Sequence, residues 1–415
     1  MASISDLGGD WRTPDSHKSL TQKNYSEFFA GIGLMRLGLE KMGWSIAFAN
    51  DIDPQKYEMY KGHFPDADSH YHVGDIHEIP CEDVPPTTLA TASFPCNDLS
   101  LAGPREGLRG KQSSAFWGFI RILKEMGSRR PPLVLIENVP GFLSCRRGRD
   151  LAEALLALNA IGYSVDAFVL DAADFVPQSR QRLFIVGIHE PKVPRNLRLV
   201  PAFAEGPVRP KLLADFMLGH PDIKWRIRNL PVPPTRDTSL TDIIEDLPSA
   251  APEWWSEERS SYLLKQMSQR HRRTAAKMIL GQGWSYGTVF RRVRNGKSMA
   301  ELRTDNVAGC LRTPRGGSGR QILLKAGKGK YFARLLTPRE CARLMGADGF
   351  HISATLNQAL FGFGDAVCVP VVEWIAKYYL NPLVSELVRE RDTGFCSTGG
   401  QSSHAPARQS AKFVL

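Results

Sequence analysis

The sequence predicts an α/β protein: a doubly wound, mostly parallel sheet joined to a smaller, irregular domain. Two observations lead to this prediction. Short apolar runs alternate with helical patterns from about residue 24 to residue 188, which is typical of a mostly parallel sheet covered by helices on both faces. Between about residues 191 and 329 prolines, glycines, paired tryptophans and arginines replace this alternation. A Rossmann-like domain interrupted by a less regular lobe is therefore expected.

The strands and helices of the main domain follow in order along the chain. The apolar runs that predict strands are 24–29, 45–50, 88–93, 133–136, 164–170 and 183–188, and the helical patterns are 116–126 and 151–161. Sheets of this kind bind ligands at the carboxyl ends of their strands. The residues that directly follow each run are therefore the candidates for a functional site.

The rest of the chain divides into three parts. Between 191 and 332 only residues 260–279 have a helical pattern. A helix is predicted to begin after Thr337, which can cap it, with Pro338 at its first position and Glu340 in the capping-box position. A last helix is predicted over 367–380. The expected division is a catalytic domain at 22–190, an irregular lobe at 191–332, a return to the catalytic domain at 333–382 and a disordered tail at 383–415.

Length and composition exclude several classes of protein. The chain has 415 residues, 42% of them hydrophobic, which excludes a disordered or fibrous protein. No run approaches the ~20 apolar residues of a membrane helix, and the N-terminal segment lacks the apolar core of a secretion signal. Seven cysteines without a CxxC pair disfavour a disulfide framework and a zinc site. A cytoplasmic protein without a metal is expected.

The positive charge is concentrated in one stretch. The chain has a net charge of +10, and residues 265–330 hold 16 Lys and Arg against two Asp and Glu. Residues 191–264 are balanced at ten of each. Phosphate contacts supply most of the non-specific affinity for nucleic acid, so this basic stretch predicts a polyanion-binding face. The alternative is an ordinary solvated surface.

The turn after the first strand suits a nucleoside cofactor. Residues 29–33 read FAGIG and open a helix, and Asp51 ends the second strand, where its carboxylate can accept hydrogen bonds from ribose hydroxyls. Asp75 closes the next unit and can accept a bond from an adenine amino group. Arg36 stands where a dinucleotide-binding GxGxxG has its third glycine, so an ordinary strand–helix turn is the alternative.

Three further segments place reactive side chains at strand ends. Cys96 follows the third run in a Pro-Cys loop and is a candidate nucleophile, whereas the other six cysteines are expected to be inert. Glu137 directly follows the fourth run, where a carboxylate is costly to bury without a role. Arg180 and Arg182 alternate in an extended segment, so both guanidinium groups share one face. A surface row of salt bridges is the alternative for this pair.

The wording and order of six motifs resemble the cytosine-5 DNA methyltransferase family. The motifs are FAGIG at 29–33, the Pro-Cys loop with a Ser four residues after the Cys, ENV at 137–139, QSRQR at 178–182, LTPRECARLMG at 336–346 and FGDAV at 363–367. The match spans about residues 26–380. It is interrupted where the family has its variable target-recognition domain, which would be the basic lobe.

This resemblance implies methyl transfer from S-adenosylmethionine to C5 of a cytosine flipped out of double-stranded DNA. Cys96 would be the nucleophile, Glu137 would contact the ring nitrogen and amino group of the cytosine, and Asn138 would brace the Pro-Cys loop. Arg180 and Arg182 would hold the base carbonyl and the active-site loop. The residues implied to hold or close over S-adenosylmethionine are Phe29, Ala30, Gly31, Ile32, Gly33, Asp51, Ile52, Asp75, Ile76, Pro95, Asp365, Ala366 and Val367.

The sequence departs twice from the commonest family pattern. Leu34 stands where a second adjacent glycine is frequent, and Asp365 stands where Asn is usual. Neither departure touches the catalytic set, but Asp365 places a charge near the sulfonium of the cofactor.

The basic lobe also contains a glycine-rich arginine loop at residues 311–320, suited to close backbone approach and to guanine edges. The residues expected to contact DNA are Arg291 and Arg292 at phosphates, and Arg312, Arg315, Gly316, Gly317 and Arg320 in this loop.

Other functions stay open at this point. Methylation of RNA by the same fold is one, a nicotinamide-dependent (NAD) oxidoreductase is another, and a non-catalytic DNA-binding protein is a third. A monomer associated with the nucleoid is expected, serving in restriction-modification or phage defence, with a cognate restriction endonuclease or defence-system proteins as partners. The recognised DNA site cannot be read from the sequence.

Overall fold

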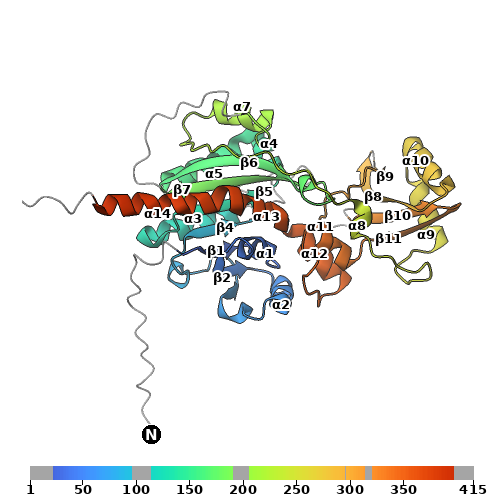
Figure 1. Cartoon of the computed structure of the whole chain (residues 1–415), viewed down its shortest axis with the longest axis horizontal. Helices are drawn as coiled ribbons and strands as arrows, with labels where there is room; N and C mark the ends of the chain where they lie inside the picture. The colour runs from blue at the N-terminus through green and yellow to red at the C-terminus, as the bar shows by residue number, and fades with distance from the viewer. Residues whose placement is uncertain (1–21, 96–113, 190–204, 295, 314–319, 397–415) are drawn as a thin grey trace, which may run out of the picture.

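The structure is a computed structural model that describes residues 22–95, 114–189, 205–294, 296–313 and 320–396, with side chains up to residue 389. The main lobe is built on a seven-stranded sheet (Figure 1). Its strands are β1 (Asn24–Phe28), β2 (Ser45–Asp51), β3 (Tyr71–Val73), β4 (Leu89–Ala92), β5 (Leu133–Asn138), β6 (Tyr163–Asp171) and β7 (Gln181–His189), in the order β3-β2-β1-β4-β5-β7-β6. Neighbours from β3 to β5 are parallel, whereas β7 is antiparallel to both β5 and β6. The predicted mostly parallel sheet is confirmed.

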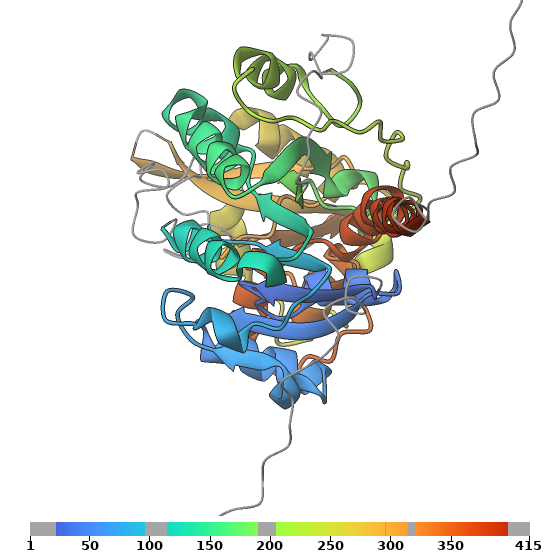
Figure 2. The same cartoon turned by 90° about the vertical axis from the view of Figure 1, so that its left-hand side faces the viewer.

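Helices cover both faces of this sheet. In Figure 2, α3 and α5 lie on one side of the strands and α14 lies on the other. The first face is covered by α3 (Ala115–Glu125), α4 (Gly141–Ser144), α5 (Arg149–Ala160) and α7 (Lys211–Gly219), and the second by α1 (Leu34–Glu40), α2 (Pro54–His63), α13 (Val369–Ile375) and α14 (Asn381–Cys396). Strand β5 has apolar side chains on both faces, so both must be covered: Leu133 and Leu135 belong to one core cluster, and Val134 and Ile136 belong to the other.

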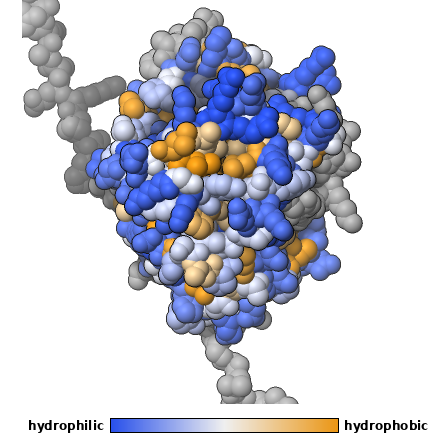
Figure 3. Space-filling model, turned by 90° about the vertical axis from the view of Figure 1, so that its right-hand side faces the viewer, coloured by the Kyte–Doolittle hydropathy of each residue, from blue (hydrophilic) through white to orange (hydrophobic). Residues whose placement is uncertain are grey.

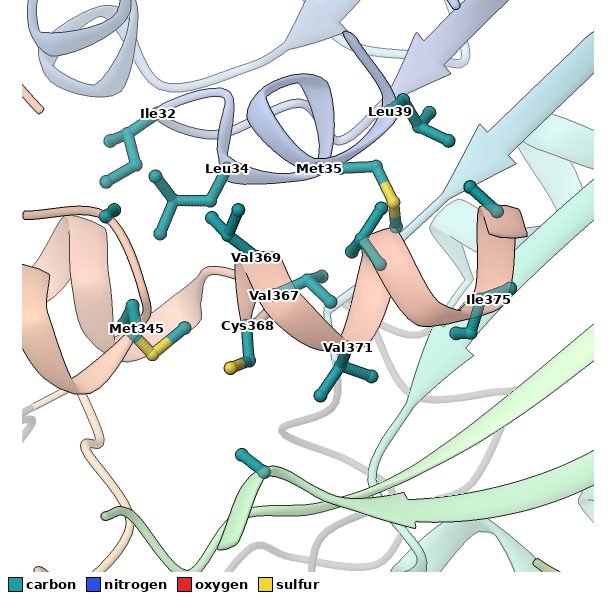
Figure 4. Close-up of a cluster of buried hydrophobic side chains, with 14 of the residues drawn as sticks. Ile32, Leu34, Met35, Leu39, Met345, Val367, Cys368, Val369, Val371 and Ile375 are labelled. Atoms are coloured by element: carbon teal, nitrogen blue, oxygen red, sulfur yellow. The ribbon is translucent and has the colours of Figure 1, made fainter. Parts of the chain in front are cut away.

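The C-terminal helices return to the N-terminal part of the sheet. In Figure 4, Leu34 of α1 lies next to Val369 of α13, and Met35 points towards a later turn of the same helix. The two helices approach closely at Gly38, where an added Cβ would lie 2.6 Å from the Cβ of Val372. This packing brings residues 363–367 beside the turn at 29–33, although more than 300 residues separate them in the sequence.

The second lobe is more regular than the sequence pattern indicates. It contains a four-stranded antiparallel sheet in the order β11-β10-β8-β9. Its strands are β8 (Ser285–Arg294), β9 (Lys297–Arg303), β10 (Ile322–Gly327) and β11 (Lys330–Leu335), and its helices are α9 (Glu257–Lys265) and α10 (Gln269–Leu280). The helix predicted over 260–279 is in fact these two helices, because Ser268 caps a new start by accepting from the backbone N–H of His271.

The domain boundaries differ from the predicted ones. Residues 206–228, expected in the second lobe, pack on the main lobe: the guanidinium of Arg209 forms a buried ion pair with Asp166 of β6 at 2.8 Å, and Trp225 pairs with Val165. Asp166 is fully buried and needs this counter-charge, which explains the packing. The predicted boundary at 332 falls inside β11. We therefore use "recognition lobe" below for residues 257–335, which hold α9, α10 and β8–β11.

Three short helices lie between the two lobes. They are α8 (Leu240–Ile243), α11 (Pro338–Leu344) and α12 (Leu356–Asp365). The predicted start of α11 is confirmed: Thr337 and Glu340 form a capping box, with Pro338 at the first position.

The end of the described chain is helical rather than a tail. The last predicted helix, 367–380, continues through a π-helical turn (Ala376–Leu380) into α14, so 383–396 are helical where disorder was expected. The rest of the predicted tail, residues 397–415, lies outside the residues that the structure describes. By length and composition the helical stretch Leu356–Arg389 could cross a membrane, but 72% of its most apolar window is buried inside the protein, as in the core of a folded domain.

Candidate active site

The carboxyl ends of β1, β2, β4 and β5 open into one cavity of about 560 Å³. Most of the predicted site residues meet there, although they come from distant parts of the sequence. Those that line it are Phe29, Ala30, Gly31, Ile32, Asp51, Ile52, Asp75, Ile76, Pro95, Glu137, Asn138, Arg180, Arg182, Asp365, Ala366 and Val367. The predicted nucleophile, Cys96, lies outside the described residues, directly after Pro95.

The FAGIG turn is held in place by Asp51. The backbone N–H of Gly31 donates to Oδ2 of Asp51 at 2.9 Å, and that of Asp53 donates to Oδ1 at 3.0 Å. Phe29 and Gly31 both have left-handed backbones, with φ of 59° and 57°. For a non-glycine residue such as Phe29 this conformation costs ~1–3 kcal/mol, and it is typical of ligand-binding turns. Asp51 therefore fixes the shape of the turn and presents a carboxylate to the cavity.

Gly33 and Arg36 have structural roles in this turn. Gly33 is not among the residues that line the cavity, so its contact with a cofactor stays a prediction. It caps α1 with φ of 83°, and an added Cβ would lie 2.5 Å from the ring of Phe64. Arg36, at the position of the missing third glycine, is buried and bonds to Tyr60, at 3.0 Å, and to Asp66, at 2.8 Å. The side chain that breaks the GxGxxG pattern thus ties α1 to α2.

Asp75 is oriented by its neighbours. The backbone N–H of His77 donates to Oδ1 of Asp75 at 2.9 Å. The loop before it is fixed by Asn50, whose side chain donates to the carbonyls of His72 and Gly74, both at 3.0 Å. Sequence reasoning missed Asn50, since a polar residue at a strand end carries no further signal.

Glu27 is a second residue that sequence reasoning missed. It lies inside β1, is 3% exposed and lines the cavity, and its Oε2 has no hydrogen-bond partner among the described residues. Burial raises its pKa to about 8, with Arg36 opposing and Glu40 and Asp51 adding to the rise. The signal that could have found it is an acidic residue inside the first predicted strand.

Glu137 and Asn138 occupy the end of β5 as predicted. Glu137 is 6% exposed, and Arg182 donates from Nε to its Oε1 at 2.8 Å. Burial raises the pKa of Glu137 above its ordinary value, although Arg182 and Arg180 act in the opposite direction. Asn138 donates from Nδ2 to the carbonyl of Phe94 at 3.2 Å. The cavity end of β5 is thereby connected to the segment that leads into the Pro-Cys loop.

The guanidinium group of Arg180 is buried and connects its own segment to the backbone at residue 311 and at residues 364–366. Arg180 is 2% exposed and donates to the carbonyls of Leu311, Gly364 and Ala366 at 2.8, 3.0 and 2.7 Å. Gln178 supports the same junction, because its Oε1 accepts from the backbone N–H of Leu311 at 2.9 Å. Arg180 is therefore a positioning residue, and Arg182 is the arginine that lies beside Glu137.

Glycine permits a close backbone contact at this junction. A Cβ at Gly364 would lie 2.8 Å from the carbonyl carbon of Arg312 and 2.9 Å from the backbone nitrogen of Thr313. The segment that closes the cofactor cavity therefore touches the start of the glycine-rich arginine loop at residues 311–320, which we call the recognition loop.

Cys310 lies beside two arginines of the site. Its Sγ lies 3.4 Å from Nη1 of Arg180 and 4.0 Å from Nη2 of Arg182. Burial raises the pKa of this thiol, but the positive charges of Arg180, Arg182 and Arg312 outweigh burial, so that its pKa lies below the ordinary value. Only the folded chain brings these residues together, so the sequence carried no signal.

The predicted DNA-contacting arginines have different environments. Consecutive residues of a strand point to opposite faces. Arg292 lies over the ring of Phe290 and 3.8 Å from Glu301. Arg291 instead lies near Arg259 of α9, whose pKa is lowered by burial and by the charge of Arg291. The two neighbours therefore do not share a face.

The recognition loop is described only at its ends. Arg312 is exposed, and Arg320 donates to Oδ1 of Asn357 in α12 at 2.8 Å. Arg315, Gly316 and Gly317 lie outside the described residues. The end of the molecule formed by the recognition lobe is mostly hydrophilic, with an apolar strip in its upper half and smaller apolar areas around it (Figure 3).

The fold and the cavity define a class of protein. A doubly wound sheet whose strand ends carry a glycine turn, two acids and a buried Glu–Arg pair is typical of enzymes that act on a substrate beside a bound nucleoside cofactor. Residues 24–381 match the family described as C-5 cytosine-specific DNA methylase. The chain belongs to this family.

Individual relatives agree with this result. A type II methyltransferase from Neisseria lactamica, M.NlaX, is 30% identical over 356 residues, covering 85% of this chain and 94% of its own. M.HhaI from Haemophilus parahaemolyticus is 27% identical over 367 residues, covering 86% and 94%.

Solved structures share the fold. The Dnmt2 methyltransferase of S. pombe has a TM-score of 0.56 at 17% identity, over 87% of this chain and 99% of its own. The EhMeth methyltransferase of Entamoeba histolytica has a TM-score of 0.59 at 14% identity, with the same coverage.

Family membership decides between the alternatives left open by the sequence. The protein is a DNA (cytosine-5) methyltransferase that takes its methyl group from S-adenosylmethionine, and it acts on DNA. A nicotinamide-dependent oxidoreductase is excluded. The matched family methylates DNA, so it does not support the alternative of RNA methylation.

Proposed function

We propose that the enzyme methylates C5 of a cytosine flipped out of a specific double-stranded DNA sequence, through a covalent adduct with Cys96. The observation that carries this proposal is the buried Glu137–Arg182 pair, at 2.8 Å, in the same cavity as Asp51 and the FAGIG turn. A target atom inside a duplex is out of reach, so the base has to leave the stack, at a cost of a few kcal/mol.

The cavity fits a cationic nucleoside. Glu27 presents a buried carboxyl oxygen that has no partner among the described residues, Asp51 presents a carboxylate, and Ile52 offers an apolar surface that is 64% exposed. S-Adenosylmethionine, when bound, supplies an electrophilic methyl group. Phe29, Gly31 and Asp75 would hold its nucleoside part, and Asp365, Ala366 and Val367 would close over it.

The protein's own residues prepare the cytosine. The thiolate of Cys96 adds to C6, and Glu137 offsets the charge that develops at the ring nitrogen, which makes C5 nucleophilic. Arg182 holds the carboxyl group of Glu137 in place. After methylation, loss of the C5 proton and expulsion of the thiolate restore the aromatic ring.

The cellular role extends this proposal. The named relatives are type II methyltransferases, which supports a role in restriction-modification or phage defence, with a cognate endonuclease or defence proteins as partners. We further propose a cytoplasmic monomer that works on the nucleoid. The domains proposed are a catalytic domain formed by the two outer parts of the chain and the recognition lobe between them.

Two measurements test the proposal. DNA carrying 5-fluorocytosine should trap the wild-type enzyme in a covalent complex, and bisulfite sequencing of DNA from expressing cells should show one methylated context. Cys96→Ser should lose both the complex and methyl transfer while still binding S-adenosylmethionine. Cys81→Ser, a half-buried cysteine outside the cavity, is the matched control. Undiminished turnover of Cys96→Ser would refute the assignment.

A further inference from the structure

An ion pair crosses the cofactor cavity. Nζ of Lys56, in α2, lies 3.1 Å from Oδ2 of Asp365, the last residue of α12. The two side chains are 21% and 42% exposed, and both line the cavity. Lys56 belongs to none of the six family motifs, and Asp365 stands where the family usually has Asn.

The pair lies between the cofactor side and the base side of the cavity. The stem of Lys56 passes over the FAGIG turn, because its Cδ is 4.0 Å from the Cβ position of Gly31. Burial lowers the pKa of Lys56, but Asp51 and Asp365 more than compensate. Asp365 in turn raises the pKa of Glu137. The charge of Asp365 is thus felt both by the lysine beside Asp51 and by the carboxyl group on the cytosine side.

This placement puts the pair within electrostatic reach of the reacting sulfur. The methyl donor has to lie between the nucleoside held near Asp51 and the cytosine held near Glu137. Before transfer this sulfur is a sulfonium cation, and after transfer it is a neutral thioether. Any net charge beside it therefore favours one of the two ligands over the other.

We propose that Lys56 is a specificity-determining residue that, paired with Asp365, sets the preference of the enzyme for the cationic donor over the neutral product, S-adenosylhomocysteine. The inference rests on the cofactor site described under Proposed function. A carboxylate alone would favour the sulfonium, and an ammonium alone would oppose it. As a pair they add little net charge to the cavity, and an Asn at position 365 would add none without needing a partner. The lysine in α2 thus compensates for the unusual aspartate.

The test is the ratio of two dissociation constants, S-adenosylhomocysteine over S-adenosylmethionine, measured by calorimetry on the full chain. Asp365→Asn removes one negative charge and the ion-pair partner of Lys56, and should lower this ratio about three- to tenfold. Lys56→Met leaves Asp365 unpaired and should raise it by a similar factor. The double variant should return to within about twofold of wild type, and Lys56→Arg, which keeps the charge, should stay at the wild-type ratio.

A surface ion pair next to the same helix provides the control. Lys61 lies on α2 like Lys56, and Asp68 lies on the short turn that follows this helix; the two are 2.8 Å apart and outside the cavity, so Lys61→Met should leave the ratio unchanged. If wild type binds both ligands and neither single variant changes the ratio, or both move it in one direction, the inference is overturned while the proposed function stands. If wild type binds neither ligand, the cofactor site itself is wrong.

Discussion

Arg182 donates from Nε to Oε1 of Glu137 at 2.8 Å, and the two side chains are only 14% and 8% exposed. Burial alone would leave the carboxyl group neutral, whereas the guanidinium favours its charged form. The balance keeps the pKa of Glu137 above its ordinary value. Glu137 is thus prepared to share or give up a proton beside a flipped cytosine.

Glu137→Gln should therefore slow the chemical step. Glutamine keeps the shape and one hydrogen bond but removes the charge and the transferable proton. A loss of ~10²–10⁴-fold is expected in the single-turnover rate, with affinity for S-adenosylmethionine little changed. A rate within twofold of wild type would mean that the carboxylate is only structural.

Arg180→Met should destabilise the protein. It would leave three buried carbonyls, those of Leu311, Gly364 and Ala366, without their present donor. Each unpaired buried acceptor costs ~1–3 kcal/mol, so the free energy of unfolding in urea should fall by ~3 kcal/mol or more. The exposed Arg272→Met is the control. Equal stability of the two variants would contradict the role of Arg180 as a junction.

Glu27→Gln should change how stability depends on pH. Because the folded pKa of Glu27 is about 8 and its ordinary value is 4.5, the fold favours the neutral carboxyl group. The stabilisation is complete below about pH 4.5 and is lost as the pH rises towards 8, by at most ~1.4 kcal/mol per pH unit. Denaturation between pH 5 and 8 without cofactor should show this loss in wild type and not in Glu27→Gln. Parallel curves would show that Glu27 ionises normally.

Arg292 and Arg291 provide a matched pair for DNA binding. Arg292 lies on the same face of β8 as Tyr286, which packs against the main core, so this face is directed towards the main lobe. If Arg292 contacts a phosphate there, Arg292→Ala should reduce the slope of log K against log salt by ~0.9, on cognate and random duplexes alike. Arg291→Ala should reduce it less. The opposite order would place the DNA on the other face.

Arg312 tests base reading separately. Its side chain is exposed at the start of the recognition loop. If it reads a guanine, Arg312→Ala should cost ~1–3 kcal/mol on the cognate duplex only and relax one position of the methylated context. Bisulfite mapping checks the context, and Lys224→Ala, exposed on the main lobe, is the control. A loss that is equal on all sequences would assign Arg312 to a phosphate.

The sequence predicted the main sheet well because apolar residues predominate in most of its strands, which are covered on both faces. All six predicted strands are present, but β3 has only three residues, two of them exposed, and left no recognisable pattern. The antiparallel direction of β7 also has no signature in its own residues. In the recognition lobe the last residues of β8, Arg292 to Arg294, are exposed, and such charged strand ends resemble a loop.

The site was predicted as a set of residues rather than as a set of contacts. Motif order placed Glu137, Arg182 and Asp51 at strand ends that do meet. The sequence did not predict contacts between distant segments, such as those of Cys310 with Arg180 and of Lys56 with Asp365. Each of them depends on packing between elements far apart in the chain, which no local pattern encodes.

The contact between Gly364 and the backbone at Arg312 has a consequence for how new DNA specificities arise. A recognition lobe from a relative can replace this one only under two conditions. Its backbone must fit against Gly364, and it must present carbonyl groups to which Arg180 can donate. A chimaera therefore cannot be designed from the lobe boundary at 335 alone. Residues 308–313 should come from the same protein as the catalytic domain. A graft that cuts inside this stretch would change the cofactor cavity along with the target site.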